Sequence, residues 1–313
     1  MKPYAFGVDL GGTTVKLGLF GPGGLADQWE IPTRTANHGE ALLPDIAAAL
    51  QAKLAEKGID AADVEGVGMG VPGAVLGDRF VKPCVNLDQW GGFDVAKQME
   101  ALCRLPVKIV NDANAAALGE MSQGGGKGAR NVVFVTLGTG VGGGVIVDGR
   151  LLAGVHGAGG EIGHIKVRPG DTRVCGCGKT GCLEQYASAT GLVRSAKALL
   201  ADPAVETTLR GYADLTCKDI FDCAKDGDAA ALRLVDEMAD LLGQALAAVS
   251  CVCDPEVIVV GGGVARAGQM LLDRIAAAFR RYAFPAAEET RFALATLGND
   301  AGIYGAVQMV RGA

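Results

Sequence analysis

The chain has 313 residues and is 49% hydrophobic, which is enough for two domains with separate cores. Its formal net charge is -6, and lysine and arginine form no basic stripe. We therefore expect no nucleic-acid partner, because binding to a phosphate backbone needs clustered positive charge. The chain shows neither a signal-peptide pattern nor an apolar run of transmembrane length, so we expect a cytoplasmic protein with no membrane partner.

The first part of the chain alternates strand and helix patterns. Short apolar runs bounded by glycine-rich turns indicate strands, and apolar residues at four-residue intervals, such as Leu42, Ile46 and Leu50, indicate a helix. The expected elements are, in order, strands at 4–10, 15–20 and about 25–33, a helix at about 39–56, a strand at about 64–70, a helix near 94–104, a strand at 107–110 and a helix from 112. This order predicts an α/β fold with a mixed sheet.

A similar pattern begins again at residue 131, which suggests that one architecture is duplicated. The expected elements are a strand at 132–138, a glycine-rich turn at 138–144, a strand at 145–149, helices at about 188–200, 218–225 and 229–250, a strand at 257–260, a helix at about 268–281, a strand at 292–296 and a last helix at 301–311. In the helix at 229–250 the predicted buried stripe contains Leu232, Val235, Met238, Leu242, Leu246 and Val249.

The glycine-rich segment QGGGKGA lies where we expect the change of domain, because glycine runs are typical of flexible connections. We expect a small N-terminal α/β domain at 1–115 and a larger C-terminal α/β domain at 116–300. The last helix, at 301–313, is expected to pack back on the first domain.

The turn between the first two strands has the composition of a phosphate-binding site. It reads Asp9-Leu10-Gly11-Gly12-Thr13-Thr14, with Lys16 on the next strand. The glycines allow backbone amides to approach an anion, the threonine hydroxyls can donate hydrogen bonds to it, and the carboxylate can organise Mg²⁺ through water. An ordinary hairpin would account for the two glycines but not for an aspartate at the end of a buried strand.

Two more glycine-rich turns follow strands. The turn Gly138-Thr139-Gly140 begins the letters of a dinucleotide fingerprint, but that motif must open a helix and here another strand follows. We interpret it as a second phosphate-binding hairpin. The turn Gly261-Gly262-Gly263 comes after a buried strand and before a helix, where backbone can approach an adenosine group.

Asn111 and Asp112 come directly after a buried strand. Ligands of α/β sheets bind beyond the carboxyl ends of the strands, where Asp9 also falls. Phosphoryl transfer to an alcohol needs a carboxylate that takes or orients the hydroxyl proton, and Asp112 is the candidate for this base. A simple helix cap is the alternative.

Four potential metal ligands, His164, Cys175, Cys177 and Cys182, lie close together in the sequence. Grouped cysteines in a large chain without an export signal favour a metal over disulfides. Three thiolates and one imidazole complete a tetrahedral zinc site and leave no vacant position, so the predicted role of Zn²⁺ is structural. Free cysteines in a loop are the alternative, and we interpret the other six cysteines as core fillers.

The three glycine turns, in this order, resemble the phosphate-1, phosphate-2 and adenosine segments of the sugar kinase, heat-shock protein and actin superfamily. Together with Glu161-Ile162-Gly163-His164 and with the cysteine segment that runs from Cys175 to Glu184, they resemble the ROK family (repressors, open reading frames and kinases) over nearly the whole chain. Within that family the bacterial glucokinases are the most similar. The resemblance implies a two-domain actin-like ATPase (ribonuclease H-like) fold with mixed sheets and a cleft between the domains.

The resemblance also implies roles for individual residues. Asp112 would be the general base of catalysis. ATP and Mg²⁺ would be bound by Asp9, Gly11, Gly12, Thr13, Thr14, Lys16, Gly138, Thr139, Gly140, Gly261, Gly262 and Gly263. The sugar would be bound by Gly73, Asn86, Asn111, Asp112, Glu161, His164 and Glu184. His164 would also be a zinc ligand, shared between the two roles.

The activity implied by the resemblance is ATP-dependent phosphorylation of a hexose at its 6-hydroxyl, with glucose as the first candidate, by a homodimer. Fructose, mannose, allose and N-acetylhexosamines are alternative substrates, and polyphosphate is an alternative donor. The family also includes sugar-responsive repressors, which carry a helix-turn-helix domain ahead of the first strand. Here that strand is expected to begin at about Tyr4, so the sequence favours the kinase.

Overall fold

The computed structural model describes residues 1–84 and 87–312. By its internal contacts the chain divides into two compact units. Unit 1 comprises Met1–Gly128, Gly144–Gly160 and Leu297–Ala313, and unit 2 comprises Ala129–Gly143 and Glu161–Thr296. The domain limits expected at residues 115 and 300 stay predictions, since a compact unit is not by itself an independently folding domain.

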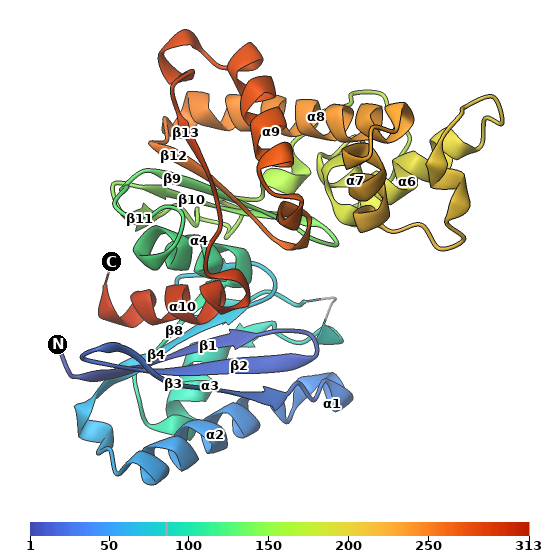
Figure 1. Ribbon diagram of the computed structural model, residues 1–313. Coiled ribbons are helices and arrows are strands. Elements are labelled where there is room, and N and C mark those ends of the chain that lie inside the picture. Colours follow the sequence, from blue (N-terminus) through green and yellow to red (C-terminus); the bar gives the residue numbers. More distant parts are fainter. Residues whose placement is uncertain (85–86, 313) are drawn as a thin grey trace. The chain divides into compact units, whose positions relative to one another are not determined.

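Unit 1 is built on a five-stranded mixed sheet (Figure 1). Its strands, in spatial order, are β3 (Gly24–Pro32), β2 (Thr14–Gly21), β1 (Tyr4–Leu10), β4 (Val64–Val71) and β8 (Val107–Asn111). The meander β1–β2–β3 is antiparallel, whereas β4 runs parallel to both β1 and β8. The parallel strands therefore end at the same edge of the sheet.

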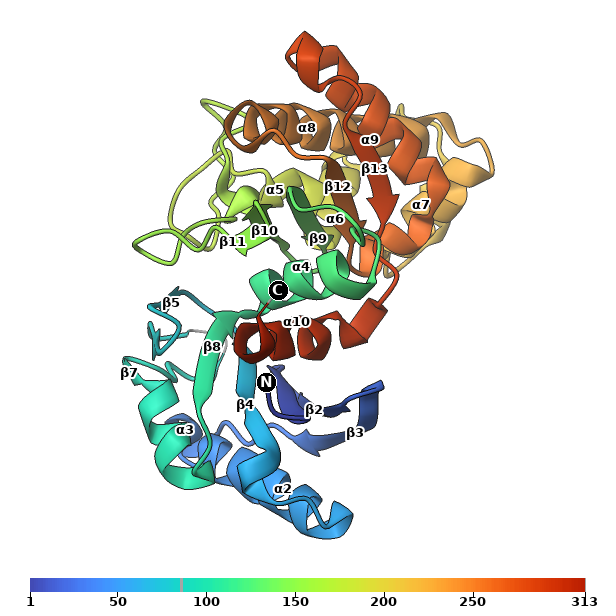
Figure 2. The ribbon, with the colours of Figure 1, turned by 90° about the vertical axis from the view of Figure 1, so that its left-hand side faces the viewer.

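Helices cover both faces of this sheet (Figures 1 and 2). On one face, Phe6 and Val8 belong to a core shared with α2 (Leu42–Lys57) and α3 (Val95–Cys103). On the other face, Ala5 packs with Ile303 of α10 (Ala301–Arg311). Alternate side chains of β1 thus point to opposite faces, as the period of a strand requires. Helix α4 (Asp112–Gln123) packs against α10.

Backbone meets backbone directly where α10 lies on β4 and α4. A Cβ atom on Gly68 of β4 would lie 1.7 Å from the carbonyl oxygen of Ala306, and one on Gly305 would lie 1.6 Å from that of Ala115. Such distances are far inside atomic contact, so these elements approach as closely as they do only because both positions lack a side chain.

The second five-stranded sheet repeats the arrangement of the first. Its strands, in spatial order, are β11 (Arg150–Leu151), β10 (Val141–Val147), β9 (Val132–Leu137), β12 (Val257–Gly261) and β13 (Arg291–Leu294). As in the first sheet, the third strand is paired in parallel with the fourth, and the fourth with the fifth. In unit 2, α8 (Ala229–Cys253) packs against α9 (Gln269–Tyr282), which contacts β13.

The remaining elements are short or peripheral. They include α1 (Ala36–Gly39), β5 (Val75–Leu76), β6 (Phe80–Val81), β7 (Phe93–Asp94), the 3₁₀ turn η3 (Ile162–His164), α5 (Glu184–Ala187), α6 (Ala189–Leu200), α7 (Cys217–Lys225) and the 3₁₀ turn η5 (Gly263–Ala267). Among the helices in residues 1–84 and 87–312, none is both long enough and apolar enough to cross a bilayer.

The predicted order of strands and helices is confirmed, with several corrections. The strand expected at 145–149 begins at Val141 and ends at Val147, because its glycines pair in the sheet, and the short strand Arg150–Leu151 follows it. The helix expected from residue 39 begins at Leu42, because Pro44 has no N–H to donate and is accommodated only in a first turn. The segment after β4 forms a small three-stranded sheet, which the sequence did not reveal because each strand has two residues. In α8, Leu232 and Val249 are only partly buried at the edges of the predicted stripe.

We predict that Gly305→Ala lowers the free energy of unfolding by about 3 kcal/mol, because the new methyl group must push α10 away from α4. Chemical denaturation in urea measures this change. Gly23→Ala is the matched control, since a Cβ at Gly23 meets nothing within 4 Å, and it should change stability by less than about 0.5 kcal/mol. Equal stability of the two variants would contradict the role of backbone contact.

Candidate active site

The carboxyl edge of the first sheet gathers the acidic residues singled out in the sequence. In the parallel register Asp9 of β1 lies opposite Gly70 of β4, and Val71 of β4 lies opposite Asn111 of β8. Asp112 follows as the first residue of α4. Parallel pairing therefore brings Asp9 and Asp112 to one edge, although they are far apart in the sequence.

Asp112 is held in a defined orientation at the start of α4. Its Oδ1 accepts hydrogen bonds from the Asn111 side-chain amide at 2.9 Å and from the backbone N–H of Ala113 at 2.8 Å. Asn111 caps α4, accepting from the N–H of Asn114 at 3.1 Å, and donates to the carbonyl oxygen of Gly73 at 3.1 Å. The hydrogen bonds from Asn111 and Ala113 thus both end on Oδ1 of the Asp112 carboxylate.

The two carboxylates are electrostatically strained. The pKa of Asp9 is raised to about 6. Burial is the largest cause, the nearby charge of Asp112 acts in the same direction, and Lys16 lowers the pKa. Asp112 has exposed surface, yet protein atoms surround its carboxyl group closely enough that desolvation raises its pKa, against the hydrogen bonds from Ala113 and Asn111. A cation near this edge would be stabilised by both charges.

The first hairpin leaves the expected phosphate-binding groups accessible. The N–H of Gly11 donates to the Thr14 carbonyl oxygen at 3.1 Å, which closes the turn, and Gly12, Thr13 and Thr14 are exposed. Lys16 is engaged elsewhere: its ammonium donates to Asp300 Oδ1 and to the carbonyl oxygen of residue 299, each at 2.9 Å. These two hydrogen bonds therefore compete with the predicted binding of the Lys16 ammonium to the nucleotide.

Among the residues predicted to contact the sugar, Gly73 lies in the turn after β4 with φ +93°, a conformation that favours glycine. Its carbonyl oxygen is the acceptor that fixes Asn111. Asn86 lies outside the described residues.

Unit 2 contains a cavity of about 530 Å³ that has the size of a small-molecule site. Its walls combine the turn at Gly138 and Thr139 with Gly263 and the following η5 turn. Strands β9 and β12 are parallel, and Thr136 of β9 lies opposite Gly261 of β12, so the two turns that follow these strands lie at the same edge of the sheet. The second and third glycine turns thus meet in one pocket.

One helix face contributes to this pocket without a signal in the sequence. Pocket residues missed from the sequence are Ala189, Cys217, Lys218, Phe221, Asp222, Lys225, Val264, Arg266 and Ala267. Those on α7 recur at helical spacing around a buried Phe221, but such spacing is shared by any amphipathic helix. Only the tertiary structure distinguishes a helix that lines a pocket from one that merely covers a core.

Not every glycine of these turns faces the cavity. Gly261 is buried within β12, where a Cβ would lie 3.0 Å from Phe134, and at Gly262 a Cβ would lie 2.5 Å from the carbonyl oxygen of Leu137. A Cβ on Gly140 would lie 2.2 Å from Glu184. Gly262 is thus crowded by backbone, whereas the atoms nearest to Gly140 and Gly261 belong to side chains.

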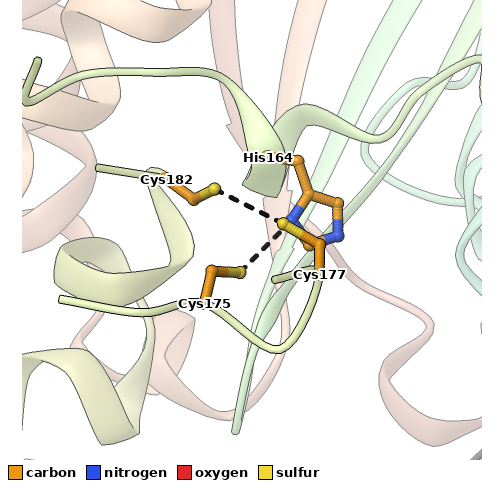
Figure 3. A group of neighbouring side chains, drawn as sticks. All are labelled: His164, Cys175, Cys177 and Cys182. Atoms are coloured by element: carbon orange, nitrogen blue, oxygen red, sulfur yellow. Dashed lines mark hydrogen bonds between the residues drawn. The ribbon is translucent and has the colours of Figure 1, made fainter. Parts of the chain in front are cut away.

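The predicted zinc ligands converge on one point of unit 2 (Figure 3). One donor atom from each of His164, Cys175, Cys177 and Cys182 lies within 4.8 Å of the others. The Sγ atoms of Cys177 and Cys182 are 3.7 Å apart, and Cys175 Sγ is 3.5 Å from His164 Nδ1. A tetrahedral zinc with bonds of about 2.3 Å to sulfur and about 2.0 Å to nitrogen separates its ligands by about 3.8 and 3.5 Å. The donor set therefore fits Zn²⁺.

Charged neighbours surround the metal ligands. The ammonium of Lys166 lies 3.3 Å from Cys182 Sγ, and Glu184 Oε1 lies 3.5 Å from Cys175 Sγ. On its other edge, His164 Nε2 lies 3.7 Å from Glu161 Oε2. Burial raises the pKa of the Cys175 thiol, and a bound metal would take the place of its proton.

Comparison with known proteins places this arrangement in a family. The model of the ROK family matches residues 5–313. The chain belongs to the ROK family. It is 44% identical to a glucokinase of Halalkalibacterium halodurans, with 97% of this chain and 94% of that protein aligned, and 38% identical to a glucokinase of Streptomyces coelicolor, with 97% and 96% aligned.

Solved ROK structures share the fold. A ROK hexokinase from Thermus thermophilus has a TM-score of 0.83 at 34% identity and covers 97% of this chain and 96% of its own. A ROK family glucokinase from Streptomyces griseus, in complex with glucose and AMPPNP, has a TM-score of 0.76 at 36% identity and covers 99% and 100%. The predicted family and the predicted actin-like α/β fold with mixed sheets are confirmed.

The raised pKa of Asp9 predicts a pH-dependent stability for this ROK protein. A group whose pKa rises on folding stabilises the folded state below its unfolded value, here 3.8, and this contribution is lost as the pH rises through about 6. The free energy of unfolding of the wild type, measured relative to Asp9→Asn, should therefore fall by about 2–3 kcal/mol between pH 4 and 7. Urea titrations at several pH values measure it, and a flat or rising difference would contradict the shift.

Metal analysis tests the ligand cluster. We expect about one zinc ion per chain after gel filtration, and we expect Cys177→Ser to lose it, because a closed tetrahedral site needs all four ligands. Cys251→Ser is the matched control: both cysteines are exposed, but Cys251 lies on α8 outside the cluster, so this variant should retain the metal. The exposure of Cys251 also corrects the expectation that it fills the core. Retention of full zinc content by Cys177→Ser would remove that residue from the ligand set.

Proposed function

We propose that the protein is an ATP-dependent sugar kinase that phosphorylates glucose at the 6-hydroxyl. The proposal is supported by relatives of 33–44% identity over nearly the full chain that are named glucokinases. It is also supported by the structure of a ROK glucokinase with glucose and AMPPNP, which has 36% identity to this chain.

The mechanism is supported by the hydrogen bonds and the raised pKa of the Asp112 carboxylate. Its carboxylate stands at the exit of β8, with Oδ1 fixed by Asn111 and Ala113 and with a raised pKa. A carboxylate with one oxygen anchored and the other accessible can accept the proton of an attacking hydroxyl, and a raised pKa makes it a stronger base. In this proposal Asp112 takes the proton of the 6-hydroxyl as the γ-phosphoryl group is transferred.

The other predicted residues divide by task. Thr13, Thr14 and the turn at Gly138 would donate hydrogen bonds to phosphates, while Asp9 would hold Mg²⁺ through water. The cavity beside Gly263 would take the adenosine. The sugar hydroxyls would be bound by Gly73, Asn86, Asn111, Glu161, His164 and Glu184.

Several finer points complete the proposal. Zinc would be structural, since the four ligands leave no coordination position for a substrate. Magnesium would accompany ATP, because phosphoryl transfer requires neutralisation of the developing charge. We further propose a cytoplasmic homodimer acting in glycolysis, in line with the family resemblance.

A kinase for an N-acetylated hexosamine is the second candidate. N-acetylmannosamine kinases of Escherichia coli and Shigella flexneri are 34% identical to this chain, and an N-acetylgalactosamine kinase of Shewanella is 32% identical. Initial rates on a panel of glucose, mannose, fructose, allose and N-acetylated hexosamines, with ATP or polyphosphate as donor, separate these candidates. The specificity constant kcat/KM should be highest for glucose with ATP.

Asp112→Asn tests the base. We expect turnover on glucose to fall by about 10²–10⁴-fold, because the amide cannot accept the hydroxyl proton, while zinc content and thermal unfolding stay near the wild type. A coupled assay of ADP formation measures the rate. Asp214→Asn, which alters an exposed carboxylate in the segment before α7, is the control and should leave turnover unchanged. Near-normal turnover of Asp112→Asn with intact zinc would reject the assignment.

A further inference from the structure

Glu184 joins two segments: the metal loop, which is the segment at residues 161–184 that carries the four metal ligands, and the glycine turn at residues 138–141. Its Oε1 lies 3.5 Å from the metal ligand Cys175, and its Oε2 accepts a hydrogen bond from the N–H of Val141 at 3.1 Å. The same Oε2 occupies the space that a side chain at Gly140 would fill, since a Cβ there would lie only 2.2 Å away. The carboxylate is therefore built into the turn as well as placed beside the metal ligands.

A second contact comes from the turn that carries His164. A Cβ on Gly163 would lie 2.1 Å from the carbonyl oxygen of Val141, so the η3 backbone packs directly on that group. The metal loop thus meets Val141 on both sides: Glu184 binds its N–H, and Gly163 lies against its carbonyl.

The start of α6 holds the other half of the turn. The N–H of Ala189 donates to the Gly138 carbonyl oxygen at 2.8 Å, and the hydroxyl of Thr190 donates to the carbonyl oxygen of Thr139. Three residues that line the nucleotide pocket, Gly138, Thr139 and Ala189, take part in these contacts.

Ser188 connects the two halves. Its hydroxyl donates to the carbonyl oxygen of Glu184 at 2.7 Å and accepts from the N–H of Gly191 at 2.9 Å, and Ser188 is buried. A change in the position of Glu184 is therefore transmitted to the start of α6, because rigid hydrogen-bonded elements move together.

We propose that the metal loop positions the turn at residues 138–141 for nucleotide binding, and that Glu184 and Thr190 are positioning residues for the nucleotide. This inference rests on the proposed function, since it assigns ATP to the pocket beside that turn. A turn held in its binding conformation loses less conformational entropy when the ligand binds, so loosening the metal loop lowers the affinity for nucleotide. The structural metal would then act on both substrates rather than on the sugar alone.

Thr190→Val tests the contact with the metal in place, because valine keeps the shape of threonine and removes the hydroxyl. The dissociation constant of a fluorescent ADP analogue, measured without sugar, should rise about three- to tenfold, as expected for one lost hydrogen bond. Thr190→Ser, which keeps the hydroxyl, should stay within about twofold of the wild type. Zinc content and glucose affinity should not change, which distinguishes loss of positioning from unfolding.

Metal removal with a chelator completes a thermodynamic cycle. In the wild type it should weaken binding of the ADP analogue, and in Thr190→Val it should weaken binding by a smaller factor, because part of the positioning is already lost. Unchanged nucleotide affinity in zinc-loaded Thr190→Val would overturn the proposal, as would metal removal that weakens glucose binding alone. Either result leaves a kinase that phosphorylates glucose intact. Absence of any sugar phosphorylation would instead reject the proposed function.

Discussion

Direct contact between backbones, made available by glycine, is the constraint on which this structure depends. In unit 1, α10 lies on β4 and α4 only because Gly68 and Gly305 have no side chains. In unit 2, the η3 backbone lies on the Val141 carbonyl only because Gly163 has no side chain. Each contact replaces side-chain packing with a fixed backbone distance. A chain with 48 glycines can therefore hold polar groups in defined positions where larger residues would force the elements apart.

At the carboxyl edge of the first sheet, the positions of two aspartates change the pKa of one of them. Neither Asp9 nor Asp112 is unusual by itself, but parallel pairing puts both at one edge, where burial and mutual repulsion raise the pKa of Asp9 to about 6. A raised carboxylate pKa costs stability at neutral pH, and such shifts are frequent at functional sites. The anchoring of Asp112 through Asn111 to Gly73 explains why a turn after β4 belongs to the same site.

At the candidate metal centre, the four ligand side chains and the residues beside them have different roles. Four donor atoms fit the tetrahedral zinc geometry, so a bound Zn²⁺ would contribute order rather than a vacant coordination position. Lys166 lies beside Cys182, and Glu184 lies beside Cys175. Glu184 also binds the backbone of Val141, and it thereby links the candidate metal site to a turn that lines the pocket proposed for the nucleotide.

The amino-acid sequence alone determined the order of strands and helices and the family, because these depend on local periodicity and on short motifs. It also singled out the four side chains that cluster at the candidate metal site and proposed Asp112 as the base, since a short motif and a strand exit followed by a helix are local patterns. It did not reveal the two-residue strands β5, β6 and β7, which are too short to show a period, or the face of α7 that lines the pocket proposed for the nucleotide. Nor did it show that a Cβ at Gly262 would meet the backbone of Leu137. Only the tertiary structure decided these points, because they depend on which distant segments meet, and sequence spacing contains no record of such contacts.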